Sequence, residues 1–245
     1  MKTFLKKMFK RFGFEVIKSR VHVEDVLIMF NFDVVFDVGA NIGQFAEYIR
    51  SQGYNGRIVS FEPVKEAYEK LKSKAMREDK WTAVNIGLGR NEVDGTINVA
   101  RSTVYSSLLK PLSAVKEFAG DAIETSAHEQ VTLRTLDSQY PIYVHGDDKV
   151  FLKIDTQGFE KEVLLGGTVS LNAIKGVQVE LSLSPMYDGE APLAEIVSFL
   201  EAHGYKMVLI DPVTYDRQKG NLLQVDCVFL KNDFGPFSAN HHIGK

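Results

Sequence analysis

The sequence predicts an α/β fold: a doubly wound, mostly parallel sheet of seven strands, with helices on both faces and an antiparallel edge strand. Short apolar runs of strand length alternate with helical patterns along most of the chain, which favours parallel strands joined by helices. The last two strands, Tyr205–Ile210 and Leu223–Leu230, are separated by about a dozen residues without a helical pattern. So short a connection indicates an antiparallel pair at one edge of the sheet.

The remaining elements follow from the spacing of apolar residues. A helix is expected where apolar residues recur at helical spacing, as Ala67, Leu71 and Ala75 do among many charges. Short apolar runs between such helices are expected to be strands. The expected strands are Asp33–Val38, Arg57–Phe61, Trp81–Ile86, Val150–Ile154 and Val177–Leu181, and the expected helices are Val23–Phe30, Gln44–Ser51, Val64–Arg77, Glu160–Leu171 and Pro192–His203.

We divide the chain into an N-terminal helical extension (residues 1–31), a main domain (residues 32–231) and a C-terminal tail (residues 232–245). Residues 87–149 separate the third and fourth strands of the main domain, and this connection is far longer than is usual in such folds. Long insertions commonly form lids or binding elements, so we expect this one to determine substrate specificity. Strands are expected within it at Thr96–Ala100 and Val131–Arg134.

The charged residues are unevenly distributed around a net charge of −3. Residues 1–20 contain seven Lys or Arg and one Glu, whereas the rest of the chain carries 22 positive and 31 negative side chains. An acidic body argues against a nucleic-acid-binding face. The single cysteine, Cys227, cannot form an intramolecular disulfide and is expected to be a buried core thiol. Since no apolar run has the length of a membrane span or a secretory signal, we expect a cytoplasmic protein.

Residues 2–12 form an amphipathic helical pattern, with Phe4, Leu5, Met8, Phe9 and Phe12 on one face and five basic residues on the other. Such a helix suits peripheral docking on an anionic membrane surface through residues 1–12. The alternative is that the apolar face packs against its own domain or against a second subunit in a homo-oligomer.

The turn after the first strand has the pattern of a cofactor site. Asp37, Gly39 and Gly43 form D-x-G-x-x-x-G, and glycines here permit a sharp turn and close approach of the backbone to a ligand. Dinucleotide sites place a further glycine where this chain has Asn41, to make room for a pyrophosphate. S-adenosylmethionine (SAM) has no pyrophosphate and therefore suits this turn.

Glu62 ends the next strand, where an acidic residue can accept hydrogen bonds from both ribose hydroxyls of a nucleoside. Asp37 is placed to meet the positively charged amino group of the methionine moiety. The alternative interpretation is an ordinary tight turn followed by a glutamate favoured at a helix N-terminus.

At this point the sequence resembles the FkbM-type methyltransferases. Phe36–Gly43 and Ser60–Pro63 are similar to the first two motifs of that family, and Leu152–Glu160 is similar to its most distinctive motif. The resemblance extends from about Val34 to about Leu230. It implies a Rossmann-like class I methyltransferase fold and a SAM-dependent transferase that usually acts on a hydroxyl oxygen. The substrates of the family include sugars of glycans, lipid-linked saccharides and natural products.

Methyl transfer to a hydroxyl needs positioning and a base near the oxygen. Asp155, which ends the fourth strand, is our first candidate for the base or for substrate positioning, and its rival role is a hydrogen bond to cofactor or to the following turn. Lys153 and Glu180 are further catalytic candidates, or else form a buried ion pair that only orders the sheet. Glu160 is a catalytic candidate in the first turn of a helix. A divalent metal on Asp155 with Glu160 or Glu180 is an alternative that no spacing demands, so no metal is assigned.

Residues after the third strand and in the insertion complete the list of candidates. Gly87 follows that strand where such domains contact the adenine, and Ser106 and Ser107 are expected to reach the same pocket. His128 and His145 could act as a general base near neutral pH, although each is also consistent with a solvated loop histidine.

Two other functions are consistent with the same fold. One is a SAM-binding module that no longer catalyses and serves in interaction or regulation. The other is an NAD-dependent oxidoreductase, against which the missing middle glycine argues. We therefore expect a SAM-dependent O-methyltransferase that acts on a hydroxyl of a sugar, a glycan or another small hydroxylated molecule.

Overall fold

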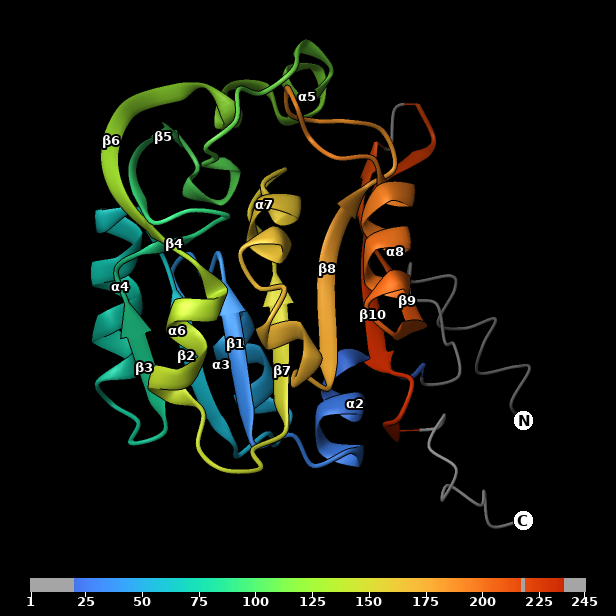
Figure 1. Ribbon diagram of the computed structural model, residues 1–245. Helices are drawn as coiled ribbons and strands as arrows, with labels where there is room; N and C mark the ends of the chain where they lie inside the picture. Colours follow the sequence, from blue (N-terminus) through green and yellow to red (C-terminus); the bar gives the residue numbers. More distant parts are fainter. Residues whose placement is uncertain (1–19, 217–218, 236–245) are drawn as a thin grey trace, which may run out of the picture.

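A seven-stranded sheet forms the centre of the computed structural model, which describes residues 20–216 and 219–235 (Figure 1). All its strands are parallel except β10, which lies between β8 and β9 and is antiparallel to both. The predicted antiparallel pair at one edge is therefore confirmed. In order across the sheet the strands are β3 (Trp81–Val84), β2 (Arg57–Phe61), β1 (Val34–Val38), β7 (Val150–Ile154), β8 (Gly176–Ser182), β10 (Asn221–Lys231) and β9 (Tyr205–Asp216).

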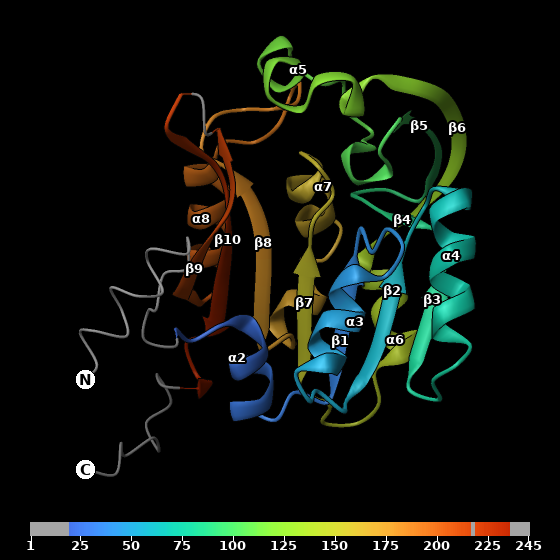
Figure 2. The ribbon, with the colours of Figure 1, turned by 180° about the vertical axis from the view of Figure 1, so that it is seen from behind.

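Helices cover both faces of this sheet, as the doubly wound prediction requires (Figures 1 and 2). One face is covered by α2 (Val23–Met29), α3 (Gln44–Ser51) and α4 (Lys65–Ala75), and the other by α6 (Leu136–Tyr143), α7 (Glu160–Leu165) and α8 (Leu193–Ala202). Because both faces are covered, every residue of β1 and β7 is buried. The polar residues of these two strands, Asp37 and Lys153, are consequently buried as well.

Several expected elements differ in their bounds from the structure; among the strands, β5 (Val93–Ala100) and β6 (Thr125–Arg134) begin earlier than expected and β3 ends at Val84. The helix predicted over Glu160–Leu171 ends at Leu165, because the backbone of Gly166 packs against that of Gly89: a Cβ on Gly166 would lie 2.0 Å from the Gly89 carbonyl oxygen. A separate 3₁₀ turn then covers Ser170–Asn172. Strands β9 and β10 extend towards each other beyond their expected bounds, so that they form one long antiparallel arm.

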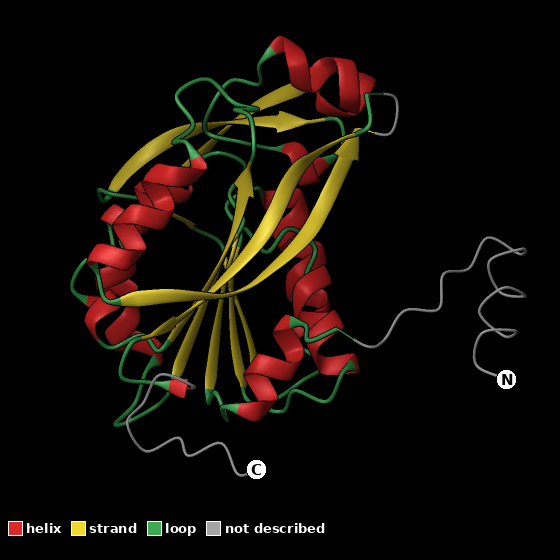
Figure 3. Ribbon diagram, turned by 90° about the vertical axis from the view of Figure 1, so that its right-hand side faces the viewer, coloured by secondary structure: helices red, strands yellow, loops and turns green. Residues whose placement is uncertain are grey.

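The insertion forms a second, three-stranded sheet in the order β4 (Gly87–Leu88), β6 (Thr125–Arg134) and β5 (Val93–Ala100). Figure 3 shows this sheet above the carboxyl end of the main sheet, with α5 (Ser113–Ala119) beside the tip of the β9–β10 arm. An ion pair between Lys219 and Glu117 joins that arm to α5. Helix α6 was not expected, because Pro141 lies inside it and interrupts the helical pattern of the sequence. Thr135 caps this helix by accepting a hydrogen bond from the Ser138 N–H.

The N-terminal helix predicted over residues 2–12 lies outside the described residues, and its membrane or subunit contact stays a prediction. Within residues 20–216 and 219–235, no helix is long and apolar enough to cross a membrane. Cys227 is 1% exposed, which confirms the buried core thiol.

Candidate active site

Two adjoining pockets open at the carboxyl end of the main sheet, where ligands bind in open α/β folds. The first, which we call the cofactor pocket, is lined by Gly39, Asn41, Glu62, Gly87, Ser106, Asp155 and Phe159 among others. The second, which we call the acidic pocket, is lined by Phe45, Lys153, Asp155, Gln178, Glu180 and Asp226 among others. Gly39, Asn41 and Asp155 belong to both, so the two pockets meet above β1 and β7.

The turn after β1 brings the backbone close to β7. Gly39 has a φ of +77°, and a Cβ placed on it would lie 1.8 Å from the carbonyl oxygen of Asp155. Gly43 has a φ of +89° and packs against the ring of Trp81. Asn41 adopts a φ of +47°, which is uncommon outside glycine. The Asn41 side chain accepts a hydrogen bond of 3.1 Å from Thr103, so the insertion contacts this turn directly.

Glu62 lies 6% exposed at the end of β2 and borders the cofactor pocket. Its two carboxylate oxygens accept hydrogen bonds from the backbone N–H groups of Asn41 and Val64, each at 2.8 Å. Burial raises the pKa of the Glu62 carboxyl to about 7, although these two donors act to lower it. The side chain is therefore fixed beside the turn by the backbone, with lone pairs left for a ligand.

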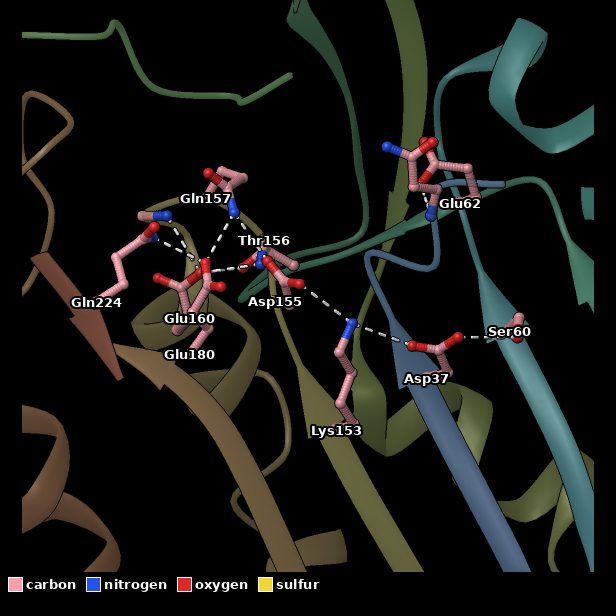
Figure 4. Close-up of polar contacts among 12 residues, drawn as sticks. Asp37, Ser60, Glu62, Lys153, Asp155, Thr156, Gln157, Glu160, Glu180 and Gln224 are labelled. Carbon is pink, nitrogen blue, oxygen red and sulfur yellow. Dashed lines mark hydrogen bonds and ion pairs between the residues drawn. The ribbon is translucent and has the colours of Figure 1, made fainter. Parts of the chain in front are cut away.

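A chain of polar contacts links four neighbouring strands, β7, β1, β2 and β3, and Figure 4 shows its part from Lys153 to Ser60. Lys153 Nζ lies 3.2 Å from Asp37 Oδ1 and 3.3 Å from Asp155 Oδ2. Asp37 also accepts a hydrogen bond of 3.2 Å from Ser60, which in turn accepts one from the indole N–H of Trp81. Burial alone would lower the pKa of Lys153, but the surrounding carboxylates of Asp155, Asp37 and Asp226 raise it above its ordinary value. These carboxylates therefore favour the charged form of Lys153.

These contacts change two of the expected pairings. The proposed ion pair between Lys153 and Glu180 is wrong, because the ammonium group of Lys153 is held by Asp37 and Asp155, while Glu180 accepts hydrogen bonds from Gln157 and Gln224. Asp37, which was expected to meet the amino group of the methionine moiety, is 0% exposed and lines neither pocket. It contacts Lys153 and Ser60 instead. The sheet register, which pairs Asp37 with Lys153, brings the two together.

Gln157 is a site residue that sequence reasoning did not single out. Its side-chain amide donates to Asp155 Oδ1 and to Glu180 Oε2, both at 2.9 Å (Figure 4). Its Oε1 accepts a hydrogen bond from the Tyr187 hydroxyl. Its backbone carbonyl accepts from Ser107 of the insertion. Gln157 thus holds two carboxyl groups together that would otherwise repel each other. The one available signal was its position within the motif that ends β7.

The geometry can be compared with known proteins. A family model described as the methyltransferase FkbM domain matches residues 37–207, more than half of the chain. The chain belongs to the FkbM methyltransferase family. The resemblance that the motifs suggested is thereby confirmed, and the enzyme class is a SAM-dependent methyltransferase.

Two curated proteins and one solved structure illustrate the relationship. The FkbM-family chain is 25% identical over 224 residues to the 31-O-demethyl-FK506 methyltransferase FkbM of Streptomyces tacrolimicus, covering 79% of this chain and 80% of that protein. It is 28% identical over 225 residues to the AMB antimetabolite synthetase AmbE of Pseudomonas aeruginosa, covering 79% of this chain but only 10% of that protein. The crystal structure of the methyltransferase FkbM from Methylobacillus flagellatus shares the fold, with a TM-score of 0.51 and 17% identity, over 82% of this chain and 44% of that one.

In this FkbM-family chain Glu160 holds a loop. Its carboxylate accepts hydrogen bonds from the backbone N–H groups of Thr156 and Gly158 and from the Thr156 hydroxyl. Burial raises the pKa of the Glu160 carboxyl to about 7. Glu160 does not line the two pockets, and its contacts fix the loop that follows Asp155.

The structure separates the remaining candidates. Ser106 and Gly87 both line the cofactor pocket, as expected. Ser107 is 2% exposed and bonds to Gln157 instead of lining that pocket. His128 and His145 are exposed and line neither pocket. Among the residues that the structure describes, no group of three or more His, Cys, Asp or Glu is arranged to hold a metal ion.

Substituting Gln157 by Glu tests the bridge between Asp155 and Glu180. The new carboxyl would replace an amide that lies 2.9 Å from each of them, so we expect the free energy of unfolding to fall by about 1–3 kcal/mol at pH 8. The loss should shrink at pH 5, where a protonated carboxyl can again donate. Urea denaturation at both pH values measures this. The control is Gln130→Glu, on an exposed part of β6, and an equal loss at both pH values would contradict the bridge.

Proposed function

We propose that this FkbM-family enzyme transfers the methyl group of SAM to a hydroxyl oxygen of a sugar, a glycan or another small hydroxylated molecule. The observation that carries the proposal is the meeting of the two pockets at Asp155. One pocket has the features of a nucleoside site, and the other presents polar groups suited to an acceptor. We also propose a cytoplasmic location, on the ground that the one cysteine is a buried thiol.

The residues of the cofactor pocket fit SAM. Glu62 uses only two of its lone pairs on backbone donors, so the carboxylate can accept further hydrogen bonds from a ribose diol. Leu88, Ile97 and Phe159 give the same pocket apolar walls, which suit a purine ring. The absence of a side chain at Gly39 lets the backbone of the turn approach a ligand.

Asp155 is placed to act as the base. When bound, SAM supplies an electrophilic methyl group on a positively charged sulfur. The side chain of Asp155 is 30% exposed and lies on the border of both pockets. One of its oxygens is held by Gln157 and the other by Lys153, so the carboxylate is fixed in orientation while lone pairs remain free. It can therefore orient the acceptor hydroxyl and take up its proton.

The other candidate residues act on Asp155 in this proposal. Lys153 holds one oxygen of the Asp155 carboxylate in place, and Asp37 balances the charge of Lys153 from below. Glu160 fixes the loop after Asp155 through its three hydrogen bonds. Burial, followed by the nearby carboxylates of Asp155 and Asp226, raises the pKa of Glu180 well above its ordinary value. Glu180 lines the acidic pocket, and its raised pKa favours the protonated form of the carboxyl more than in an exposed glutamate.

Isothermal titration with SAM and with its product S-adenosylhomocysteine (SAH) tests the cofactor site. We expect micromolar binding that is lost in Glu62→Ala and weakened in Asp37→Ala, because Asp37 is fully buried in β1 and its truncation leaves a cavity beneath the glycine turn. Binding of neither compound by the wild type would refute the proposal. Binding of SAM without methyl transfer to any acceptor would instead favour a non-catalytic SAM-binding module.

The pH dependence of SAH binding reports on Glu62. Ribose hydroxyls donate to the ionised carboxyl, so binding must release the proton that this group holds below its pKa of about 7. We expect the affinity for SAH to rise about tenfold from pH 6 to pH 8, and Glu62→Gln to remove this dependence. Stability without ligand has the opposite sign: since the folded pKa is raised, the contribution of Glu62 falls as pH rises from about 4.5 towards 7.

A further inference from the structure

We propose that the acidic pocket binds a protonated amine of the acceptor, next to the hydroxyl that lies at Asp155. The inference rests on the proposed function and specifies the class of acceptor as an amino alcohol, of which an amino sugar is an example. Its basis is a row of acidic side chains across β8, β10 and β9, together with a buried side-chain oxygen of Gln178 that has no partner in the protein.

The row of acidic side chains is unusual for a sheet. Asp226 of β10 lies directly opposite Glu180 of β8 on one side and opposite Asp211 of β9 on the other. Like charges opposite one another destabilise an antiparallel pair. Burial, followed by the charge of Asp155, raises the pKa of Asp226 to about 6, so this carboxyl is ionised near neutral pH at a cost in stability. Such local conflicts are expected where a side chain serves a ligand.

The basic side chains that the structure describes near the row are in ion-pair contact with carboxylates other than Asp226. Lys153, which lines the pocket, is already shared between Asp37 and Asp155. His22 lies 3.5 Å from Asp211, on the far side of the row. Asp226 therefore remains without a basic side chain in ion-pair contact within the part of the chain that the structure describes. A positively charged ligand group would supply the missing charge, whereas an anionic group would be repelled.

Gln178 indicates the kind of cation. The side chain is 3% exposed and lines the acidic pocket beside Asp226, to which its amide donates a hydrogen bond. Its Oε1 has no hydrogen-bond partner in the protein. An unpaired buried acceptor beside a carboxylate calls for a ligand with several N–H donors. An ammonium group can donate to Gln178 Oε1 and to Asp226 together, which a methylated or acylated amine cannot do as well.

Titration of the SAH-saturated enzyme with D-glucosamine, N-acetyl-D-glucosamine and D-glucose tests the inference, with binding followed by saturation-transfer NMR. We expect D-glucosamine to bind at least about tenfold more tightly than the two neutral sugars. Asp226→Asn and Gln178→Leu should remove this preference, while Glu201→Gln, on an exposed part of α8, should keep it. A second readout is stability: Asp226→Asn should raise the melting temperature, because it relieves the repulsion within the row.

The outcomes separate the two proposals. The amine site would be overturned by equal binding of the three sugars, by no binding of D-glucosamine, or by a preference that persists in Asp226→Asn. In each of these cases, binding of SAH would still leave the methyltransferase proposal intact. Failure of SAH itself to bind would refute the proposed function before any sugar is added.

Discussion

Asparagine in place of Asp155 is expected to reduce methyl transfer by about 10²–10⁴-fold, with the fold and cofactor binding retained. The change removes the group that would take the proton of the acceptor hydroxyl. The amide keeps nearly the same shape, and Lys153 still has Asp37 as a partner. The measurement is the rate of SAH formation with an acceptor found in a screen that starts with sugars, amino sugars and lipid-linked glycans.

Two controls distinguish the base from a structural role for Asp155. SAH affinity and melting temperature should change little in Asp155→Asn. Glu160→Gln should lower the melting temperature and leave the pH profile of the reaction unchanged, because Glu160 only holds the loop. Retention of full activity by Asp155→Asn would mean that another group takes the proton, and Glu180 would then be the next residue to test.

Alanine in place of Gly39 is expected to lower the free energy of unfolding by about 3–5 kcal/mol and to abolish SAH binding. Its Cβ would lie 1.8 Å from the carbonyl oxygen of Asp155, an atom of the backbone that cannot turn aside. Either the ends of β1 and β7 must separate or the turn must change its conformation, and both alter the two pockets. Urea denaturation and titration with SAH measure the two effects.

Gly53→Ala is the matched control for this substitution. Gly53 also has a positive φ, of +101°, but a Cβ there would meet nothing within 4 Å. Its substitution should therefore cost only about 1 kcal/mol of backbone strain and leave SAH binding unchanged. If the two variants lost similar stability, the close approach of Gly39 to β7 would not be the cause.

The sequence predicted most of the main sheet, because its signals are local. Apolar runs such as Arg57–Phe61 and Val150–Ile154 correspond residue for residue to β2 and β7. The glycine turn and Glu62 were recognisable because each comes at a strand end, which fixes its place at one edge of a parallel sheet. Five residues that line the cofactor pocket, Gly39, Asn41, Glu62, Gly87 and Asp155, could thus be named from the sequence, whereas Asp37 and Gly43 were named with them and do not line it.

What the sequence could not predict depends on contacts between distant segments. The partner of Lys153 follows from the register of β1 against β7, and the two strands are more than a hundred residues apart in the chain. The hydrogen bonds of Gln157 depend on Tyr187 and on Ser107, which come from separate loops. The early end of α7 depends on Gly89, whose backbone passes beside Gly166.

Trp81, the one tryptophan of the chain, gives the site a built-in optical reporter. Its ring is 5% exposed, packs under the turn at Gly43 and donates a hydrogen bond to Ser60. Tryptophan emission should therefore be blue-shifted in the folded enzyme and should respond when a ligand tightens that turn. Because no second indole contributes, stopped-flow fluorescence can follow cofactor arrival and departure in the unlabelled protein, independently of any knowledge of the acceptor.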